Sequence, residues 1–458
     1  MLLDNGDTRA VHFVGIGGAG MRALAELFVR RGMAVSGCDN NFESALDLAE
    51  KGITLLGPHD VSHAEAARAI VISSAINRDV PELERARELG IPVIRRAEAL
   101  GEAVSGKEMV GVAGTHGKTT TTVMTTEALC AAGLNPTGIV GGRVASWNGN
   151  LSGGGDDVFV VESDEYDRSF LALKPTVAVV TNIEADHLDI YADLDDIRVA
   201  FSQFVAGARV IVLCADDKTA NSLATPSTAE VIRYGTESPD ARLVATNIQP
   251  SSNGTRFDVV YDGKKFCSVV LPIPGMHNVR NSLAALAAGI ALGADPAKLS
   301  AGLGMYTGVE RRFQRLGDFG GVTIVDDYAH HPSEISATLQ AARATFPGRR
   351  VIAAFQPHLY SRTRDFCNEF ASALAGADET FLLDLYPARE QPIAGVSSRM
   401  IADAMRQLGS APRWEGPRDA ATCAIRDSVA DGDVVITIGA GDVTKVAYEL
   451  QQGLTAGE

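Results

Sequence analysis

One glycine-rich segment carries the residues best suited to hold the phosphates of a nucleotide. It follows the apolar stretch Met109–Ala113 directly and consists of Gly114, Thr115, His116, Gly117, Lys118, Thr119 and Thr120. In a loop of this kind backbone N–H groups surround the phosphates, the lysine neutralises the β and γ oxygens, and the first hydroxyl reaches Mg²⁺. Val112 replaces the first glycine of the general pattern, but the tighter Gly-Thr-x-Gly-Lys-Thr form is the more specific one. The segment therefore predicts a phosphate-binding loop with Mg²⁺.

Carboxylates and a histidine follow two further predicted strands. Glu162 ends the apolar run Val158–Val161, which is where a phosphate-loop enzyme places the carboxylate for its metal. His187 lies among carboxylates past the stretch Thr176–Thr181, and it is a candidate for a second Mg²⁺ or for orienting a transferred phosphoryl group. A loop with surface charges is the alternative for His187. A solvated acidic loop is the preferred interpretation of three neighbours of Glu162, namely Asp164, Glu165 and Asp167.

A second glycine-rich turn, near the N-terminus, predicts a pyrophosphate site. Gly15, Gly17 and Gly20 follow the run Val11–Val14 and open a predicted helix, and Asp39 follows the next predicted strand. In the dinucleotide-binding pattern the glycines serve a tight turn, the close approach of a phosphate and helix–strand packing. The pattern does not identify the nucleotide, and a structural turn is the alternative. Because two such loops occur in one chain, we expect an enzyme that binds one diphosphate compound and hydrolyses another.

Two loops in the last third of the chain contain cations. His330 and His331 lie in Asp326–Glu334, and His358 lies in Phe355–Arg364, each after a predicted strand. Ligand sites of α/β proteins form at strand ends, so cations there in an acidic protein suit an anionic ligand. Zinc binding by the His-His pair is not favoured, because no second pair stands at ligand spacing.

Two asparagines, Asn278 and Asn281, stand at the start of an Ala-rich helix predicted over Asn281–Leu292. A helix cap accounts for one of them. Together with His277 they are also candidates for hydrogen bonds to an adenine edge.

The elements that must position these residues alternate regularly. Short Val/Ile-rich runs are followed by Ala/Leu-rich helical stretches, which predicts an α/β fold with parallel sheets and crossover helices. The alternation divides into three units, residues 1–107, 108–310 and 311–458. The second unit ends in a more β-rich stretch, Arg242–Leu271, and the third has predicted strands at Val322–Asp326, Arg350–Phe355, Glu379–Leu385 and Asp433–Ile438.

Composition excludes several classes of function. The chain has 458 residues and a net charge of −16, which argues against a nucleic-acid or anionic-membrane binder because both need a basic face. No apolar stretch approaches the roughly 20 residues of a membrane span, and Asp4 and Asp7 have the wrong charge for a signal peptide. The six cysteines form no CxxC pair, so they are expected to be reduced cytosolic thiols rather than disulfides or a zinc site. A cytoplasmic location is therefore expected.

With these residues in view, the chain resembles the Mur ligase family along nearly its whole length. The resemblance rests on seven segments in the expected order, which are Gly15–Met21, Gly114–Thr120, Glu162–Phe170, Thr181–Asp189, His277–Asn281, Asp326–Glu334 and Phe355–Thr363. It implies an N-terminal UDP-binding Rossmann-like domain, a central phosphate-loop ATPase with a mixed sheet, and a C-terminal Rossmann-like domain. Within the family the chain is most similar to the member that adds L-alanine to UDP-N-acetylmuramate.

The resemblance also implies roles for single residues. ATP and Mg²⁺ are expected at the phosphate loop, with Thr119, Glu162 and His187 on the metals, and Lys118, Glu162, His187 and His330 in catalysis. The remaining ATP residues implied are Asn278, Asn281, Arg312 and Asp327. The UDP-sugar or alanine would be held, in place of NAD, by Gly15, Gly17, Gly18, Gly20, Asp39, Ser73, Ser74, Arg168, Tyr328, His330 and Arg362.

The implied activity is that of an ATP-dependent ligase which forms an amide between L-alanine and the lactyl carboxylate of UDP-N-acetylmuramate through an acyl phosphate, in peptidoglycan precursor synthesis. A monomer or a homodimer is expected. Two positions depart from the family. Phe201 stands where several sister ligases carry a carbamoylated lysine, which fits the alanine-adding member, and Leu359 stands where many members have arginine. An NAD-dependent oxidoreductase, a murein tripeptide ligase and a non-catalytic nucleotide-binding regulator are the alternatives.

Overall fold

A computed structural model describes residues 6–455 except 75, 77, 78, 189, 252, 253 and 389, and leaves the side chain of Ser44 undescribed. By its internal contacts the chain forms two compact units. The first unit comprises Met1–Asn247, Phe257–Val270 and Arg280–Thr307, and it holds the N-terminal sheet and most of the central sheet. The second unit comprises Ile248–Arg256, Leu271–Val279 and Gly308–Glu458, and it holds the C-terminal sheet. The predicted three-domain α/β fold is confirmed, with one sheet for each domain.

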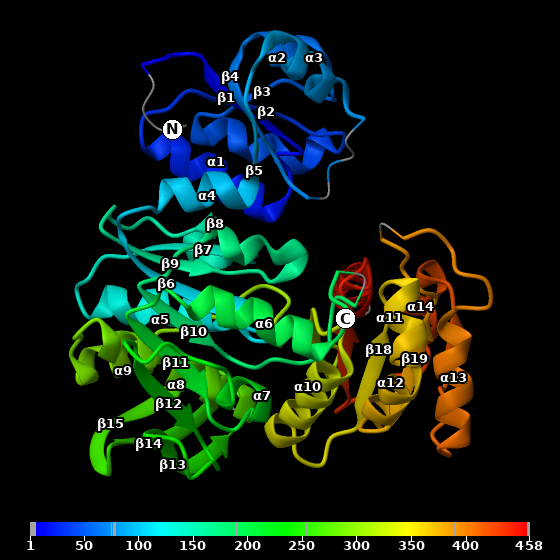
Figure 1. Ribbon diagram of the computed structural model, residues 1–458. Helices are drawn as coiled ribbons and strands as arrows, with labels where there is room; N and C mark the ends of the chain where they lie inside the picture. The colour runs from blue at the N-terminus through cyan, green and yellow to red at the C-terminus, as the bar shows by residue number, and fades with distance from the viewer. Residues whose placement is uncertain are drawn as a thin grey trace. The chain divides into compact units, whose positions relative to one another are not determined.

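The N-terminal sheet is fully parallel. Its strands are β1 (Ala10–Val14), β2 (Val35–Cys38), β3 (Thr54–Leu55), β4 (Ala67–Ile72) and β5 (Val93–Arg95), in the spatial order β3-β2-β1-β4-β5. Its helical segments are α1 (Ala19–Arg30), η1 (Phe42–Lys51), α2 (Ser62–Glu65), α3 (Pro81–Leu89) and α4 (Arg96–Ala103). The strand order reverses between β1 and β4, which is the place where ligands bind in open α/β sheets. The glycine-rich turn follows β1 there (Figure 1).

Side chains of β1 alternate between two cores, as the two-residue period of a strand requires. Val11 and Phe13 pack with Leu24 and Phe28 of α1. Val14 packs with Leu83 of α3 in a second cluster on the other side. Helices therefore cover both faces of this sheet.

The central sheet is mixed and has ten strands. They are β6 (Glu108–Ala113), β7 (Thr137–Val144), β8 (Gly149–Leu151), β9 (Val158–Glu162), β10 (Val177–Val180), β11 (Val210–Cys214), β12 (Glu230–Gly235), β13 (Leu243–Ser251), β14 (Gly254–Tyr261) and β15 (Lys264–Leu271). The spatial order is β15-β14-β13-β12-β11-β10-β6-β9-β7-β8. Strands β9, β6 and β10 are parallel neighbours, so the segments that follow them emerge at one edge of the sheet.

Helices complete this part of the chain. They are α5 (Lys118–Ala131), η2 (Ala145–Trp147), η3 (Tyr166–Ala172), α6 (Leu194–Val205), α7 (Lys218–Asn221), α8 (Met276–Ala291) and α9 (Pro296–Gly304). Phe201 and Phe204 of α6 pack on Ala178 and Val180 of β10. The Ala-rich helix begins at Met276, earlier than predicted, so Asn278 and Asn281 both lie within its first turns.

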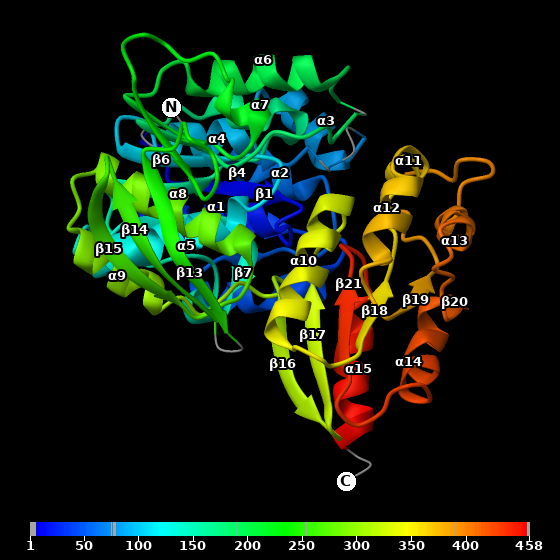
Figure 2. The same ribbon diagram turned by 90° about the horizontal axis from the view of Figure 1, so that it is seen from below.

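The C-terminal sheet carries helices on both faces (Figure 2). Its strands are β16 (Gln314–Phe319), β17 (Val322–Asp327), β18 (Val351–Phe355), β19 (Glu379–Leu383), β20 (Trp414–Gly416) and β21 (Val434–Ile438), in the order β16-β17-β21-β18-β19-β20. The pair β16–β17 is antiparallel, and the pairs β17–β21, β21–β18, β18–β19 and β19–β20 are parallel. The helices are α10 (Pro332–Thr345), α11 (Tyr360–Asp365), α12 (Cys367–Leu374), α13 (Ser398–Gln407), α14 (Arg418–Arg426) and α15 (Thr444–Thr455).

Within the part of the chain that the structure describes, no helix is long and apolar enough to cross a membrane.

Candidate functional site

The phosphate loop joins β6 to α5 through two glycines in conformations that other residues rarely adopt. Gly114 has φ +141° and Gly117, the N-cap of α5, has φ +81°. A Cβ on Gly114 would lie 1.9 Å from Oγ1 of Thr181, and a Cβ on Gly117 would lie 2.6 Å from Oδ1 of Asn281. Both positions therefore require glycine for space as well as for backbone conformation.

The segment after β10 holds this loop in place. Backbone N–H groups of Thr115 and His116 donate to the backbone oxygen and to Oδ1 of Asn182, at 3.0 and 2.8 Å. Oγ1 of Thr181 donates to the carbonyl of His116 at 2.6 Å. The Glu184 N–H donates to Oγ1 of Thr115 at 2.8 Å. The loop is thus ordered by residues that lie far away in the sequence, and Asn182 is a supporting residue that sequence reasoning did not single out.

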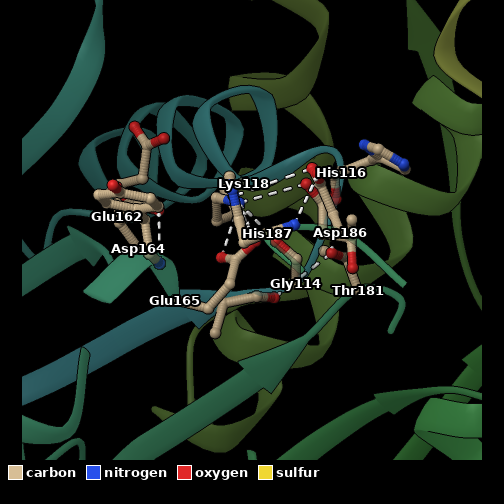
Figure 3. A network of polar contacts seen from close by, with 12 residues as sticks. Gly114, His116, Lys118, Glu162, Asp164, Glu165, Thr181, Asp186 and His187 are labelled. Carbon is tan, nitrogen blue, oxygen red and sulfur yellow. Dashed lines mark hydrogen bonds and ion pairs between the residues drawn. The ribbon is translucent and has the colours of Figure 1, made fainter. Parts of the chain in front are cut away.

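Lys118 lies at the centre of the polar network (Figure 3). Its Nζ donates to the carbonyls of Gly114 and Thr115, at 2.7 and 3.2 Å, and lies 2.8 Å from Oε2 of Glu165. Burial alone would lower the pKa of this ammonium, but the carboxylates of Glu165, Asp164 and Glu162 outweigh burial and raise the pKa above its usual value. Lys118 therefore keeps its positive charge at neutral pH.

Glu165 corrects the sequence-based interpretation of its segment. It was expected in a solvated acidic loop, yet it is only 3% exposed and pairs with Lys118. Burial raises the pKa of its carboxyl to about 7, although Lys118 opposes that shift. The hydroxyl of Tyr191 donates to the Glu165 carbonyl at 2.6 Å and helps to fix the residue. Local sequence showed only an acidic run, and burial of one of its members arises from the tertiary packing.

Thr119 and Glu162 form a second pair beside Lys118. Oγ1 of Thr119 donates to Oε1 of Glu162 at 2.8 Å, and the Gly141 N–H donates to Oε2 at 2.6 Å. A hydroxyl and a carboxylate oxygen are hard ligands of the kind that Mg²⁺ prefers. The donor set fits a magnesium ion, because the Thr119 hydroxyl turns readily from donating to the carboxylate to coordinating a cation with its oxygen. Thr120, the next residue of α5, is buried.

His187 belongs to the other side of the Lys118 network. Its Nε2 lies 4.0 Å from Oε1 of Glu165 and 3.8 Å from Oδ2 of Asp186. The ring packs edge-on against Tyr166 with centroids 5.1 Å apart, and the backbone has φ +54°. The structure therefore connects His187 to Lys118 through Glu165 (Figure 3). Asp189, the last residue of the same motif, lies outside the described residues.

The N-terminal glycine turn is also ordered, but by an acidic residue. Gly15 has φ +77° and donates its N–H to the Cys38 carbonyl at 2.9 Å. The Gly17 N–H donates to Oδ2 of Asp39 at 2.9 Å. Gly18 is the N-cap of α1, and a Cβ on Gly20 would lie 3.0 Å from Nη1 of Arg96. Ser73 and Ser74 follow β4 directly, so they lie past the neighbouring strand at the same sheet edge.

Arg168, predicted to bind substrate, is engaged within the chain. Its Nη2 lies 2.7 Å from both carboxylate oxygens of Asp196, and its guanidinium lies 4.8 Å from the centre of the Tyr191 ring. The backbone has φ +53°. Arg168 therefore already has an anionic partner that an anionic substrate would have to displace or join.

The two asparagines of α8 have different surroundings. Nδ2 of Asn278 donates to the Pro274 carbonyl at 2.7 Å, so this side chain ties the helix to the preceding turn rather than capping its N–H groups. Asn281 lies against Gly117 of the phosphate loop. Asn281 is thus a neighbour of the phosphates' predicted position.

The C-terminal unit by itself gathers most of its predicted residues around Tyr328. The guanidinium of Arg312 lies 5.3 Å from the Tyr328 ring centre, and the ring of His330 packs edge-on against it with centroids 5.3 Å apart. Burial raises the pKa of the adjacent Asp327 to about 6, opposed by the charge of Arg312. Nδ1 of His330 lies 2.9 Å from the Tyr328 carbonyl. Because a carbonyl can only accept, Nδ1 carries the proton and Nε2 is the acceptor of the neutral ring.

A second loop of the same unit approaches this group. The His358 ring lies with its centroid 6.2 Å from that of His330 and stacks on Tyr386 at 5.9 Å. Arg362 is buried in α11, and Leu359, the N-cap of that helix, has φ +71°. Leu359 is itself buried, so it contributes to packing where many family members carry arginine. Tyr386 was not predicted, and nothing in its local sequence marks it.

The chain matches three family models along most of its length. Residues 10–108 match the Mur ligase family catalytic domain, residues 112–289 the Mur ligase middle domain, and residues 311–441 the Mur ligase glutamate ligase domain. A UDP-N-acetylmuramate–L-alanine ligase of Salinibacter ruber is 43% identical over 96% of this chain and 94% of its own length. One of Paenarthrobacter aurescens is 44% identical over 95% and 94%.

A solved structure has the same fold over the whole chain. The UDP-N-acetylmuramate-alanine ligase MurC of Thermotoga maritima superposes with a TM-score of 0.84 and is 29% identical, covering 98% of this chain and all of its own. A murein peptide ligase of Psychrobacter arcticus superposes with a TM-score of 0.71 at 23% identity, which is a likeness of fold alone.

Proposed function

Because this chain belongs to the Mur ligase family, we propose that it joins L-alanine to the lactyl carboxylate of UDP-N-acetylmuramate with cleavage of ATP. The relatives that are more than 40% identical over nearly the whole chain carry this activity in their names. The structural observation that carries the proposal is the buried Lys118 ammonium, held by loop carbonyls and Glu165 at the start of a phosphate-loop helix. The reaction would serve peptidoglycan precursor synthesis in the cytoplasm, where the six free cysteines stay reduced.

The chemistry explains why a triphosphate is needed. A carboxylate is a poor acyl donor because its leaving group would be oxide. Transfer of the γ-phosphoryl group converts it into an acyl phosphate, from which phosphate leaves when the amine of L-alanine attacks the acyl carbon. Both reactants of the first step are anions, so positive charge and N–H groups must offset their repulsion.

Residues of the phosphate loop would perform that task. Lys118 offers a permanent charge, and the N–H groups of the first turn of α5 would donate to the phosphates. Thr119 and Glu162 are proposed to hold one Mg²⁺ and His187 a second, and when bound these ions would neutralise phosphate oxygens. Asn281 and Asn278 are proposed on the ATP side, together with Arg312 and Asp327.

The sugar nucleotide is proposed to lie at the N-terminal glycine turn. Gly15, Gly17, Gly18 and Gly20 would accept the diphosphate, and Asp39 the ribose. Ser73, Ser74 and Arg168 are proposed as further contacts. Tyr328, His330 and Arg362 are proposed near the muramoyl group or the alanine, and the acceptor Nε2 of His330 suits removal of a proton from the attacking amine.

Phosphate release tests the proposal directly. The chain is incubated with ATP, Mg²⁺ and UDP-N-acetylmuramate, and L-alanine, glycine, L-serine or the murein tripeptide is added in turn. We expect release to depend on the sugar nucleotide and to be fastest with L-alanine. Faster release with the tripeptide would instead assign a murein peptide ligase, and NADH binding at the glycine turn would favour an oxidoreductase.

A further inference from the structure

A second group of side chains that could hold a metal lies at the N-terminal sheet, and only Cys38, whose carbonyl accepts from Gly15, was named in the site above. It consists of His12 on β1, Cys38 at the end of β2, His59 after β3, His63 on α2 and Glu82 on α3, and is called here the His-Cys-Glu cluster. Three of the nine histidines of the chain are gathered in it. A fully buried glutamate such as Glu82 is rare in a hydrophobic core unless it is paired.

The ligand atoms of the cluster converge on one point. The Sγ of Cys38 lies 3.3 Å from Nε2 of His12, 3.2 Å from Nδ1 of His59 and 3.3 Å from Oε1 of Glu82. Nδ1 of His63 lies 3.3 Å from the same Glu82 oxygen. One donor atom from each of His12, Cys38, His63 and Glu82 lies within 4.8 Å of all the others.

Burial leaves one oxygen of the cluster without a hydrogen-bond partner among the described residues, although Oε1 of Glu82 also accepts the Asp60 N–H at 2.9 Å. Glu82 is fully buried, and within the described part of the chain its Oε2 has no hydrogen-bond partner. His12 is fully buried as well, and His63 is 7% exposed. A buried carboxylate oxygen without a partner carries a desolvation penalty, which a bound cation would remove.

We propose that the His-Cys-Glu cluster binds one Zn²⁺ through Nε2 of His12, Sγ of Cys38, Nδ1 of His63 and the carboxylate of Glu82. In tetrahedral zinc sites, with metal–ligand distances of about 2.0–2.3 Å, ligand atoms lie about 3.3–3.7 Å apart. Three of the six separations, His12–Cys38, Cys38–Glu82 and His63–Glu82, are 3.3 Å, and all six are within 4.8 Å. His59, whose Nδ1 lies 3.2 Å from Oε1 of Glu82, is the neighbour that can replace a ligand.

The ligand chemistry selects zinc over the Mg²⁺ of the phosphate loop. Thiolate and imidazole are softer ligands than the oxygens that Mg²⁺ prefers, and one sulfur, two nitrogens and a carboxylate form a typical zinc set. Nδ1 of His12 lies 3.0 Å from Oγ of Ser36, so the ring nitrogen that does not face the metal has the partner that orients metal-bound histidines.

Proton balance accompanies binding. In the unloaded cluster the Cys38 thiol donates to Oε1 of Glu82 at 3.3 Å. When Zn²⁺ binds, the sulfur–metal bond forms and this proton leaves to solvent. Metal affinity is consequently expected to rise with pH.

The expected role of the metal is structural. Four protein ligands leave no open coordination position, which is typical of structural zinc sites. The ligands join β1, β2, α2 and α3, and the carbonyl of Cys38 accepts the N–H groups of Gly15 and Ile16 at 2.9 and 3.0 Å. A metal at Cys38 would therefore also hold the base of the N-terminal glycine turn.

Cobalt substitution of the full-length chain tests the proposal without any mutation of the cluster. The chain is purified, stripped with a chelator, and titrated with Co²⁺ in the presence of excess Mg²⁺, in a Cys130→Ser, Cys423→Ser background that removes the two exposed thiols. We expect visible d–d bands of a tetrahedral ion and a near-ultraviolet thiolate-to-cobalt band, saturating at about one equivalent and lost when Zn²⁺ is added. Absence of the thiolate band overturns the proposal.

Variants then assign the ligands. Cys38→Ser and His63→Asn are each expected to weaken Zn²⁺ binding at least about 100-fold, measured by competition with a chromophoric chelator, and Ser36→Ala about 10-fold. Cys214→Ser, which alters another buried cysteine, should bind zinc as the parent does. Added Zn²⁺ should raise the melting temperature of the parent but not of Cys38→Ser. Equal zinc affinity of the parent and both cluster variants overturns the assignment, whether or not the chain forms an amide.

Discussion

The two glycine-rich turns of this protein share a backbone conformation, but the charged side chain that contacts each turn has the opposite sign. Each follows a buried parallel strand and opens a helix, with Gly15 or Gly114 at positive φ. In the phosphate loop the centre of the site is the Lys118 ammonium, surrounded by three carboxylates that raise its pKa. In the N-terminal turn a carboxylate, that of Asp39, accepts a hydrogen bond from the Gly17 N–H.

The difference separates holding a phosphate from transferring one. Backbone N–H groups at a helix N-terminus suffice to bind a diphosphate. Transfer of a phosphoryl group to another anion needs a fixed cation and metal ligands as well. Only the phosphate loop offers both, in Lys118 and in the Thr119–Glu162 pair.

Removal of Lys118 should have the largest effect. Lys118→Ala is expected to lower turnover by at least about 10³-fold, because it removes the central cation of the transfer site. ADP formation with all substrates present measures the effect. The change also leaves the buried Glu165 carboxylate without its cation. A Lys118→Met, Glu165→Gln double variant removes both charges together and serves as the folding control. Near-parental ADP formation in either variant would reject Lys118 as a phosphate ligand.

Glycine replacement should distinguish the two turns next. Gly114→Ala places a Cβ 1.9 Å from Thr181, in a backbone conformation strained for alanine, and turnover is expected to fall about 100-fold with a loss of about 1–3 kcal/mol in unfolding free energy. Gly15→Ala meets only the end of the Ile76 side chain, at 2.6 Å, and should be milder. Gly207→Ala, with no atom nearby, is the control for stability and turnover. A larger loss for Gly15→Ala than for Gly114→Ala would reverse the ranking.

The pH profile should report on Glu165. Its pKa of about 7, against a usual 4.5, means that between these two pH values the folded chain holds a proton on Glu165 which the unfolded chain has released. Raising the pH through this window should therefore cost stability and at the same time charge the partner of Lys118. We expect turnover to rise with pH through about 7, and Glu165→Gln to lose this rise and about 10- to 100-fold of the rate at pH 8.

Rate and urea-unfolding measurements at several pH values check both expectations for Glu165. The matched control is Glu127→Gln, since burial raises the pKa of that carboxyl to about 7 as well, outside the phosphate loop. It should flatten part of the stability profile and leave the rate profile intact. An unchanged rate profile in Glu165→Gln would remove Glu165 from the transfer site.

The smallest effect is expected at the N-terminal turn. Asp39→Ala removes a hydrogen-bond acceptor from Gly17 and the proposed ribose contact, and should raise the KM for the sugar nucleotide about 10-fold, equal to about 1.4 kcal/mol. The KM for ATP should not change. Steady-state kinetics with each substrate varied in turn makes the comparison. A selective rise in the KM for ATP would mean that ATP, and not the sugar nucleotide, binds at the N-terminal turn.

Local patterns were enough to predict the α/β class, most strands and both glycine turns. Val11–Val14 and Glu108–Ala113, for example, are strands within a residue of the expected bounds, because a short buried apolar run between glycines has few alternatives. The helix over Asn281–Leu292 was predicted too short at its start, since His277, Asn278 and Val279 have low helix propensity. Glu165 was placed in solvent because local sequence does not record burial.

The order of residues along the chain by itself determined the family, the phosphate loop and the candidates around it, because those residues are neighbours within single turns whose conformation is local. Only the tertiary structure decided which distant groups meet. It buried Glu165 against Lys118, tied the loop to Asn182, and gathered His12, Cys38, His63 and Glu82 from four elements into one cluster. The sequence separations of these residues do not predict such a cluster, because parallel strands and the helices between them bring together residues that are far apart in the chain.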